Sequence, residues 1–237
     1  VTDKINEVIK NLANEFVPIP PNENLPYSRN NPSIKYQIRI NQFLVRHLSG
    51  SITNQQQLYE IDSGFNLLQI RETLQQFVAD KNITTLLDYG AGKTNQYAPL
   101  SINTEKGNEQ FHLQQFLNLK EIKCYDPGYP PISDLAQQTV DCVVCCDVLD
   151  RCPEEDLLWI LSEIFSLAEI CVFIKINHWD NGVKLNNDEP EVCVIKPKEW
   201  WVDLISTVRK AYPDLIVSLI LQTTEQGQTE DITAMIK

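Results

Sequence analysis

The sequence contains no apolar run that approaches the roughly 20 residues needed to cross a lipid bilayer as a helix, and its start shows no signal-peptide pattern. Lysine and arginine are few and scattered, 20 in all against 32 aspartates and glutamates, which gives a formal net charge of −12. This excess of carboxylates repels a phosphate backbone unless a local basic cluster offsets it, and no window of the sequence holds such a cluster. We therefore expect neither a membrane nor a nucleic acid as a partner.

Metal-ligand patterns are also missing. Cys142 and Cys145 form a Cys-x-x-Cys, but residues three apart on a strand point to opposite faces, and no second pair has zinc-ligand spacing. The sequence thus predicts no metal site. Seven cysteines, an odd number, lie mostly within apolar runs such as "DCVVCCDVL", which favours reduced thiols and a cytoplasmic location.

What the chain does have is ordinary globular composition, 43% hydrophobic and 22% charged over 237 residues, enough to bury a sizeable core. Its first third shows helical spacing of apolar residues at 4–16, 33–49 and 65–80. In the second of these segments the spacing runs through Ile34, Ile38, Phe43, Leu44 and Leu48.

A proline-rich stretch interrupts these helices. Residues 17–32, "VPIPPNENLPYSRNNP", contain five prolines and cannot be helical, so they predict an extended strap that carries Tyr27 and Arg29. The strap either closes over a site as a lid or packs as a surface arm.

From residue 83 onward, predicted strands alternate with predicted helices. The strands are "ITTLLDY" (83–89), "EIKCYD" (121–126), "VDCVVCCDV" (140–148), "EICVFIKI" (169–176), "IVSLILQT" (216–223) and "DITAMIK" (231–237). Helices are predicted over 153–168 and 196–213, each with a proline near its start. This order predicts an α/β fold, a Rossmann-like doubly wound and mostly parallel sheet that ends in an antiparallel hairpin. We divide the chain into an N-terminal helical extension, residues 1–64, and a Rossmann-like domain, residues 65–237.

The turn after the first of these strands, "DYGAGKT" (88–94), has three interpretations. A phosphate-binding loop of the ATPase type needs a glycine five residues before Gly92, where the chain has Leu87 inside the strand. A dinucleotide-binding turn has a third glycine where this chain has Asn95. What remains is an acidic residue, one spacer and Gly-x-Gly at a strand-to-helix turn.

This remaining pattern resembles the first motif of class I S-adenosylmethionine-dependent methyltransferases, and its residues here are Asp88, Tyr89, Gly90, Ala91 and Gly92. The second predicted strand ends in Asp126 and Pro127, where the family has an acidic residue that binds ribose hydroxyls. The third ends in Asp147, Val148, Leu149, Asp150 and Arg151, which is similar to the family's Asp-Val-Leu-Glu-His. Three motifs in this order, each at the carboxyl end of a strand, form a specific pattern. The resemblance covers residues 65–237 and extends to small stand-alone bacterial and phage-encoded members.

The resemblance implies S-adenosylmethionine as cofactor, bound by Asp88 to Gly92, by Asp126 with Pro127, and by Asp147 to Leu149. Asp88 is expected to accept hydrogen bonds from the methionine end, or else to cap the following helix. Asp126 is expected to accept hydrogen bonds from two ribose hydroxyls, or else to form the turn before Pro127. Asp147 lies near the sulfonium end or only satisfies backbone amides.

Asp150, Arg151 and His178 are the candidate catalytic residues. His178 follows the fourth predicted strand, where acceptor groups often lie in this family, and is a candidate general base; the alternative is a loop histidine exposed to water. The chain departs from the family at Thr94, where a third glycine is usual, and at Arg151, which replaces a histidine.

The spacing between the motifs departs from the family as well. An additional loop or helix is expected between Gly92 and Asp126, and the helix and strand that usually follow Asp126 are expected to be missing or reduced.

The function implied is in-line transfer of a methyl group from S-adenosylmethionine to an acceptor, which the protein aligns and desolvates. "DVLD" lacks the Asn/Asp-Pro-Pro-aromatic signature of enzymes that methylate exocyclic amines of DNA bases, so a small-molecule or glycan acceptor is favoured. One alternative is a non-catalytic domain of the same fold in a larger polypeptide, motivated by Thr94, Arg151 and the start at Val1. Another is an NAD-dependent oxidoreductase.

Overall fold

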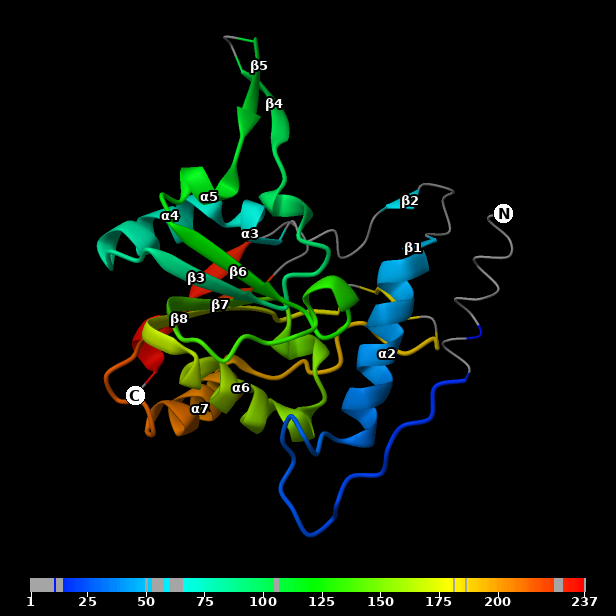
Figure 1. Ribbon diagram of the computed structural model, residues 1–237. Coiled ribbons are helices and arrows are strands. Elements are labelled where there is room, and N and C mark those ends of the chain that lie inside the picture. The colour runs from blue at the N-terminus through cyan, green and yellow to red at the C-terminus, as the bar shows by residue number, and fades with distance from the viewer. Residues whose placement is uncertain are drawn as a thin grey trace.

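The computed structural model describes residues 11, 15–49, 51–52, 58–59, 66–104, 107–180, 182–185, 187–223 and 228–236. The helix predicted over 4–16 lies almost entirely outside these residues. At the centre is a six-stranded sheet of order β10-β9-β8-β7-β3-β6 (Figure 1). Its strands are β3 (Thr85–Tyr89), β6 (Glu121–Tyr125), β7 (Val140–Cys146), β8 (Ala168–Asn177), β9 (Ile216–Gln222) and β10 (Thr229–Asp231). All neighbouring strands pair in parallel except β9 and β10, which are antiparallel. The predicted fold class is confirmed.

Helices cover both faces of the sheet (Figure 1). On one face lie α3 (Asn66–Gln69), α4 (Arg71–Asp80) and α5 (Leu113–Phe116), and on the other lie α6 (Leu157–Ser166) and α7 (Lys198–Arg209). Because side chains alternate along a strand, Leu86 packs with the first group of helices and Leu87 with the second. Strand β7 is apolar nearly throughout because both of its faces are covered.

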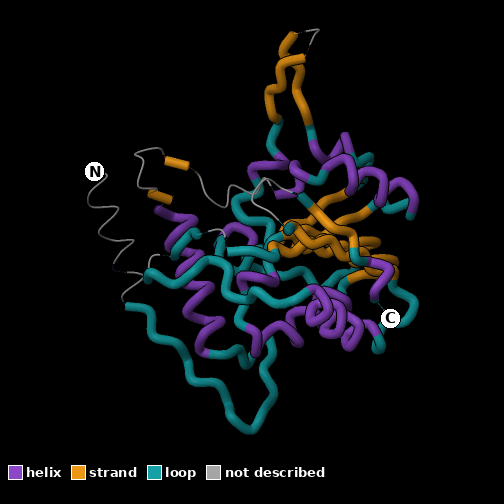
Figure 2. Tube along the Cα trace, turned by 180° about the vertical axis from the view of Figure 1, so that it is seen from behind, coloured by secondary structure: helices purple, strands orange, loops and turns teal. Residues whose placement is uncertain are grey.

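The segments that connect β3 to β6 and β6 to β7 determine where this sheet can bind a ligand. Between β3 and β6 the chain forms a hairpin of β4 (Leu100–Thr104) and β5 (Gly107–Phe111), which projects from the body (Figures 1 and 2), and then α5. Between β6 and β7 the described residues form only a 3₁₀ turn, Pro130–Ile132, so neither the helix nor the strand that was expected to be missing or reduced is present in this segment. Strands β6 and β7 lie on opposite sides of β3 in the sheet. The strand order therefore reverses at β3, and open parallel sheets bind ligands at such a switch point.

The chain before residue 65 contributes α2 (Ile34–Ser49) and a small antiparallel pair, β1 (Ser51–Ile52) and β2 (Leu58–Tyr59). Ser33 begins α2, since its Oγ accepts a hydrogen bond from the amide of Tyr36 at 3.0 Å. Asp156, before α6, accepts a hydrogen bond from the amide of Ser33 at 3.0 Å. Helix α2 is thereby fixed beside α6, at the carboxyl ends of the strands (Figure 1).

The strap is fastened to the sheet domain through Arg29. Its guanidinium pairs with Glu163 of α6, and its Nη1 donates to the hydroxyl of Tyr125 at 2.8 Å. Tyr89, from β3, donates to the same Glu163 at 2.6 Å. Nearer the start of the strap, Gln37 of α2 holds Ile19. Its side-chain oxygen accepts a hydrogen bond from the amide of Ile19, and its side-chain nitrogen donates one to the carbonyl of Ile19. In this structure the strap packs as an arm on α6 and α2.

Two local predictions differ from the structure. The strand predicted over 231–237 is wrong beyond Asp231, because the chain turns there into a 3₁₀ segment, Thr233–Met235. The Asp231 carboxylate accepts a hydrogen bond from the amide of Thr233 at 2.9 Å, which favours a turn over a strand. The helix predicted from residue 153 starts instead as a 3₁₀ turn, Glu154–Asp156, and becomes α-helical at Leu157.

Candidate ligand-binding site

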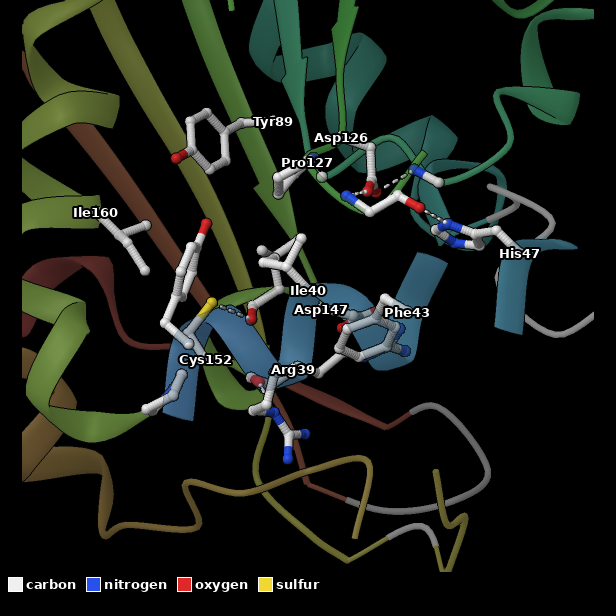
Figure 3. A pocket seen from close by; sticks show the side chains of 17 residues that line it. Arg39, Ile40, Phe43, His47, Tyr89, Asp126, Pro127, Asp147, Cys152 and Ile160 are labelled. Carbon is white, nitrogen blue, oxygen red and sulfur yellow. Dashed lines mark hydrogen bonds between the residues drawn. The ribbon is translucent and has the colours of Figure 1, made fainter. Parts of the chain in front are cut away.

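A pocket of about 70 Å³ lies at the carboxyl ends of β3, β6 and β7 (Figure 3). The loops after these strands form one wall, with Tyr89, Gly90 and Gly92, Asp126 to Gly128, and Asp147 with Val148. Helix α2 forms the facing wall with Tyr36, Arg39, Ile40, Phe43 and His47. Arg151 to Pro153 and Ile160 complete the lining. Residues that follow three separate strands therefore meet at one place.

The glycine turn after β3 is shaped by close packing. Gly90 has φ +88°, and a Cβ atom at this position would lie 2.2 Å from Cγ2 of Val148, so any side chain here would strain the backbone and force Val148 to shift. The amides of Gly90 and Ala91 both donate to the carbonyl of Tyr125, at 2.7 and 3.0 Å. These contacts bind the turn after β3 to the end of β6. Ala91 is buried behind the turn and does not line the pocket.

Asp126 also links the turn after β3 to the turn after β6. Its Oδ2 accepts a hydrogen bond from the amide of Gly92 at 2.9 Å, and its Oδ1 accepts one from the amide of Gly128 at 2.8 Å. A carboxylate has about four positions that accept hydrogen bonds. Asp126 and Pro127 both line the pocket.

Asp88 points away from the pocket, to the α4 face of the sheet. Its Oδ2 accepts hydrogen bonds from Gln96 at 2.9 Å and from the hydroxyl of Tyr97 at 2.8 Å. Burial raises the pKa of Asp88 to about 7, although the hydrogen bond from Tyr97 acts to lower it. Asp88 therefore holds the 3₁₀ segment Asn95–Tyr97, which follows the glycine turn, and does not line the pocket.

The end of β7 places one carboxylate in the pocket. Asp147 is 5% exposed, lines the pocket and has φ +57°, and its Oδ1 accepts a hydrogen bond from Lys175 of β8 at 2.6 Å. Val148 lines the pocket next to it, whereas Leu149 is fully buried in the core.

The three candidate catalytic residues occupy different environments. Arg151 lines the pocket, and its Nη1 lies 2.9 Å from Oε1 of the buried Glu191. Asp150 is fully buried, and neither carboxylate oxygen has a hydrogen-bond partner among the described residues. Burial raises the pKa of Asp150 to about 7, although the charge of Arg151 acts to lower it. His178 is half-buried outside the pocket, with its amide bonded to the carbonyl of Gln222 at 2.9 Å. The pocket does not bring Asp150 and His178 together with Arg151.

The polar face of α2 is the part of the site that sequence reasoning missed. The apolar spacing favoured Ile34 and Leu48 as core positions, but they are 42% and 47% exposed. Arg39 and His47 are buried instead, and with Phe43 they recur every four residues on the face that lines the pocket. That spacing of long polar and aromatic side chains was the signal available in the sequence.

Backbone carbonyls hold these two polar side chains. Arg39 donates from Nε to the carbonyl of Arg151 at 2.6 Å, and from Nη2 to the carbonyl of Pro190 at 3.1 Å. His47 contacts the carbonyl of Gly128 through Nδ1 at 2.8 Å (Figure 3), and a Cβ at Gly128 would lie 2.9 Å from Cβ of Phe43. Since a carbonyl only accepts, Nδ1 of His47 carries the proton. Helix α2 is therefore pressed against the turn that presents Asp126.

The size of the pocket limits what it can hold in this arrangement. Ligand pockets usually measure about 300–1,000 Å³. The volume here is about 70 Å³ because α2 packs directly over the strand ends. A nucleoside-sized ligand therefore does not fit the pocket in this arrangement.

Several other features bear on the chemistry. All seven cysteines are free. Within the described residues, no group of three or more histidine, cysteine, aspartate or glutamate side chains is arranged to hold a metal ion. None of the helices in the described part of the chain combines the length and the apolar character that crossing a bilayer requires.

Comparisons with known proteins give little beyond this. No protein-family model matches the chain, and neither does any curated protein. Among solved structures, the chain is similar to coclaurine N-methyltransferase bound to N-methylheliamine and SAH, at 14% sequence identity and a TM-score of 0.23. That match covers 71% of this chain and 56% of the other.

Proposed function

We propose that the protein is an S-adenosylmethionine-dependent methyltransferase that acts on a small-molecule or sugar acceptor. The observation that carries the proposal is the convergence of three separate sequence motifs on one pocket. Gly90 and Gly92, Asp126, and Asp147 follow three different strands, and all of them line it. The pocket lies at the switch point of a parallel sheet, the usual ligand site of this architecture.

In this proposal the nucleoside end of the cofactor binds between the glycine turn and α2. Asp126 accepts hydrogen bonds from the ribose hydroxyls, in addition to those from the amides of Gly92 and Gly128. Gly90 allows the left-handed turn and the close packing of Val148 that shape this wall of the pocket. Asp88 takes part only indirectly, through the segment Asn95–Tyr97 that it holds.

The methyl group and the acceptor then meet near Asp147 and Arg151. The pocket also has apolar lining residues, Tyr36, Ile40 and Ile160, which suit an organic acceptor and help to exclude water. Arg151 is the candidate catalytic residue that lines the pocket, and we propose that it orients the acceptor. The cofactor supplies an activated methyl group, so the protein contributes alignment and desolvation.

Access requires movement of the N-terminal extension. The present volume of about 70 Å³ corresponds to a closed arrangement, and the extension acts as the lid through α2 rather than through the strap alone. An outward shift of α2 must break the contact between His47 and Gly128.

Isothermal titration calorimetry with S-adenosylmethionine and with S-adenosylhomocysteine tests the proposal, with thermal shift as a second measurement. We expect saturable heat and a raised melting temperature with both compounds, and no response to NADH or ATP. No heat and no shift from either adenosyl compound would contradict the proposal and favour a non-catalytic domain of the same fold. Heat with NADH alone would favour an oxidoreductase.

A further inference from the structure

Strand β6 is an outer edge of the main sheet, and the proposed function makes no use of that edge. Among the described residues, β6 pairs with β3 on one side and with no strand on the other. The backbone groups of successive residues in a strand point alternately to its two sides. The amide of Glu121 and the carbonyl of Tyr125 bond to the residues just before and just after β3. The backbone groups of Ile122 and Cys124 therefore point outward, away from β3.

These outward backbone groups are open to a further strand. In the described part of the chain, no hydrogen bond joins the amide or the carbonyl of Ile122 or Cys124 to a segment beside β6. The pairing of β6 with β3 runs over five residues without a shift in register, and the strand contains no proline. A regular edge of this kind is a template on which another strand can pair.

The opposite edge of the sheet offers much less. Strand β10 has only three residues, and the chain turns directly after it into the 3₁₀ segment Thr233–Met235. Very short edge strands are one of the ways in which natural sheets prevent pairing with other chains. Strand β6 is thus the edge of this sheet at which another chain can add a strand.

The side chains of β6 are complementary to a second copy of the same strand. When two copies meet antiparallel with Ile122 opposite the partner's Ile122, Glu121 of each lies opposite Lys123 of the other. Opposite charges directly across two strands attract, and like charges repel. Glu121 is exposed and Lys123 is half-buried. The Lys123 ammonium donates to Gln138 at 3.0 Å, an exposed contact that a carboxylate of the partner can replace.

We propose that the edge of β6 joins two copies of this chain into a two-fold symmetric dimer, in which the two sheets become continuous. The same strand serves on both sides of such a contact, so its charges must be complementary to themselves, and those of Glu121 and Lys123 are. Parallel pairing in register would instead place like charges opposite each other. This dimer does not depend on any ligand and stands apart from the proposed function.

The contact is small, so the dimer should be weak. One edge strand buries less than the roughly 1,000 Å² of a stable interface, and we expect a dissociation constant of about 10–100 µM. Sedimentation velocity over about 5–500 µM covers this range. The weight-average mass should rise with concentration from 27.2 kDa toward twice that value. A salt concentration of about 0.15 M screens repulsion between distant charges of the two acidic copies.

Exchange of the two charges tests the pairing itself. Lys123→Glu sets two carboxylates against each other on both sides of the two-fold axis and should weaken dimerisation by about tenfold or more. Glu121→Lys alone should do the same, and the double variant with both substitutions should recover the natural affinity within about threefold. The control is Lys210→Glu, which changes the net charge equally at an exposed residue after α7 and should leave dimerisation unaltered.

Amide hydrogen exchange, followed by NMR, gives a second measurement on the natural protein. The amide of Ile122 points outward and becomes bonded only in the dimer, so its exchange should slow as the protein concentration rises. The amide of Lys123 faces β3 in both states, and its exchange should not depend on concentration. This measurement also decides the matter if circular dichroism shows that a charge variant is not folded.

Four outcomes would overturn the inference. The first is a mass that stays at one chain over the whole concentration range. The second is a dimer that Lys123→Glu leaves intact, because its interface then lies elsewhere. The third is a failure of the double variant to recover affinity, because the two charges then do not face each other. The fourth is exchange at Ile122 that does not slow with concentration. None of these results bears on the binding of S-adenosylmethionine.

Discussion

The amide of Gly92 donates a hydrogen bond to Oδ2 of Asp126 at 2.9 Å. This bond joins the turn after β3 to the turn after β6, and the amide of Gly128 holds the other oxygen of the same carboxylate at 2.8 Å. The two turns thus fix each other before a ligand arrives. Asp126 is both a part of the frame and a candidate contact for the ligand.

Asp126→Ala should therefore weaken binding of S-adenosylmethionine by about 1–3 kcal/mol, because it removes a charged hydrogen-bond acceptor and loosens both turns. Calorimetry measures the change. Asp134→Ala, which removes an exposed acid from the same connection, is the control and should leave affinity unaltered. Equal affinities for the two variants would remove Asp126 from the site.

Gly90→Ala should lower the free energy of unfolding by more than the substitution of an ordinary surface residue does. The new Cβ would lie 2.2 Å from Val148, and φ is +88°, so overpacking and backbone strain act together and cost about 2–4 kcal/mol. Gly182→Ala is the matched control, with φ +67° and no atom within 4 Å of the new Cβ, and should cost only about 1–2 kcal/mol. Urea denaturation compares the two. Equal losses would mean that the contact with Val148 relaxes freely.

Thr94→Gly should stabilise the protein by up to about 1 kcal/mol. Thr94 has φ +61°, which is unfavourable for a β-branched residue and natural for glycine. Asn82→Gly provides the comparison, because Asn82 has φ +54° but asparagine tolerates this conformation, so the gain should be smaller. A loss of stability in Thr94→Gly would show that its side chain has a packing role that outweighs the strain.

Arg29→Ala should release the strap. The substitution removes the pairing with Glu163 and the hydrogen bond to Tyr125, and we expect a loss of about 1–3 kcal/mol. Hydrogen exchange should quicken in residues 16–33 and stay unchanged in α7. Arg71→Ala breaks an exposed pair with Glu72 and should change stability by less than about 1 kcal/mol. Unchanged exchange in the strap would show that Arg29 does not hold it.

Two buried carboxyl groups should make stability fall as pH rises. Burial raises the pKa of Asp88 and of Asp150 from 3.8 to about 7 in each case. Between pH 4 and 7 the unfolded chain loses protons that the folded chain keeps, so this contribution to the free energy of unfolding decreases across that window and is constant above it. In Asp88→Asn the difference between pH 5 and pH 8, measured by urea denaturation, should be smaller than in the natural protein. The same difference in both would contradict the buried, protonated state of Asp88.

The strands of the sheet could be predicted from the sequence because the signals for them are local. Short β-branched runs such as that before Gly90, and helices that begin after Pro153 and Pro197, depend on residues near in the chain. The last strand was mispredicted because a single side-chain hydrogen bond, from the amide of Thr233 to Asp231, competes with strand formation and leaves no trace in the apolar pattern.

The site was harder to predict than the sheet. The motif residues Gly90, Asp126 and Asp147 were identified because they follow strands, and parallel strands bring their carboxyl ends to one edge. The side chains of β3 alternate between the two faces of the sheet. The sequence does not disclose that Asp88 points to the face where its partners Gln96 and Tyr97 lie.

The sequence by itself determined the alternation of strands and helices, the glycine turn and the acidic strand ends, because each of these rests on the conformational preferences of neighbouring residues. Only the tertiary structure decided that α2 covers the strand ends and that Lys175 stands behind Asp147. Both are contacts between segments far apart in the chain, and packing and burial rather than local preference select them.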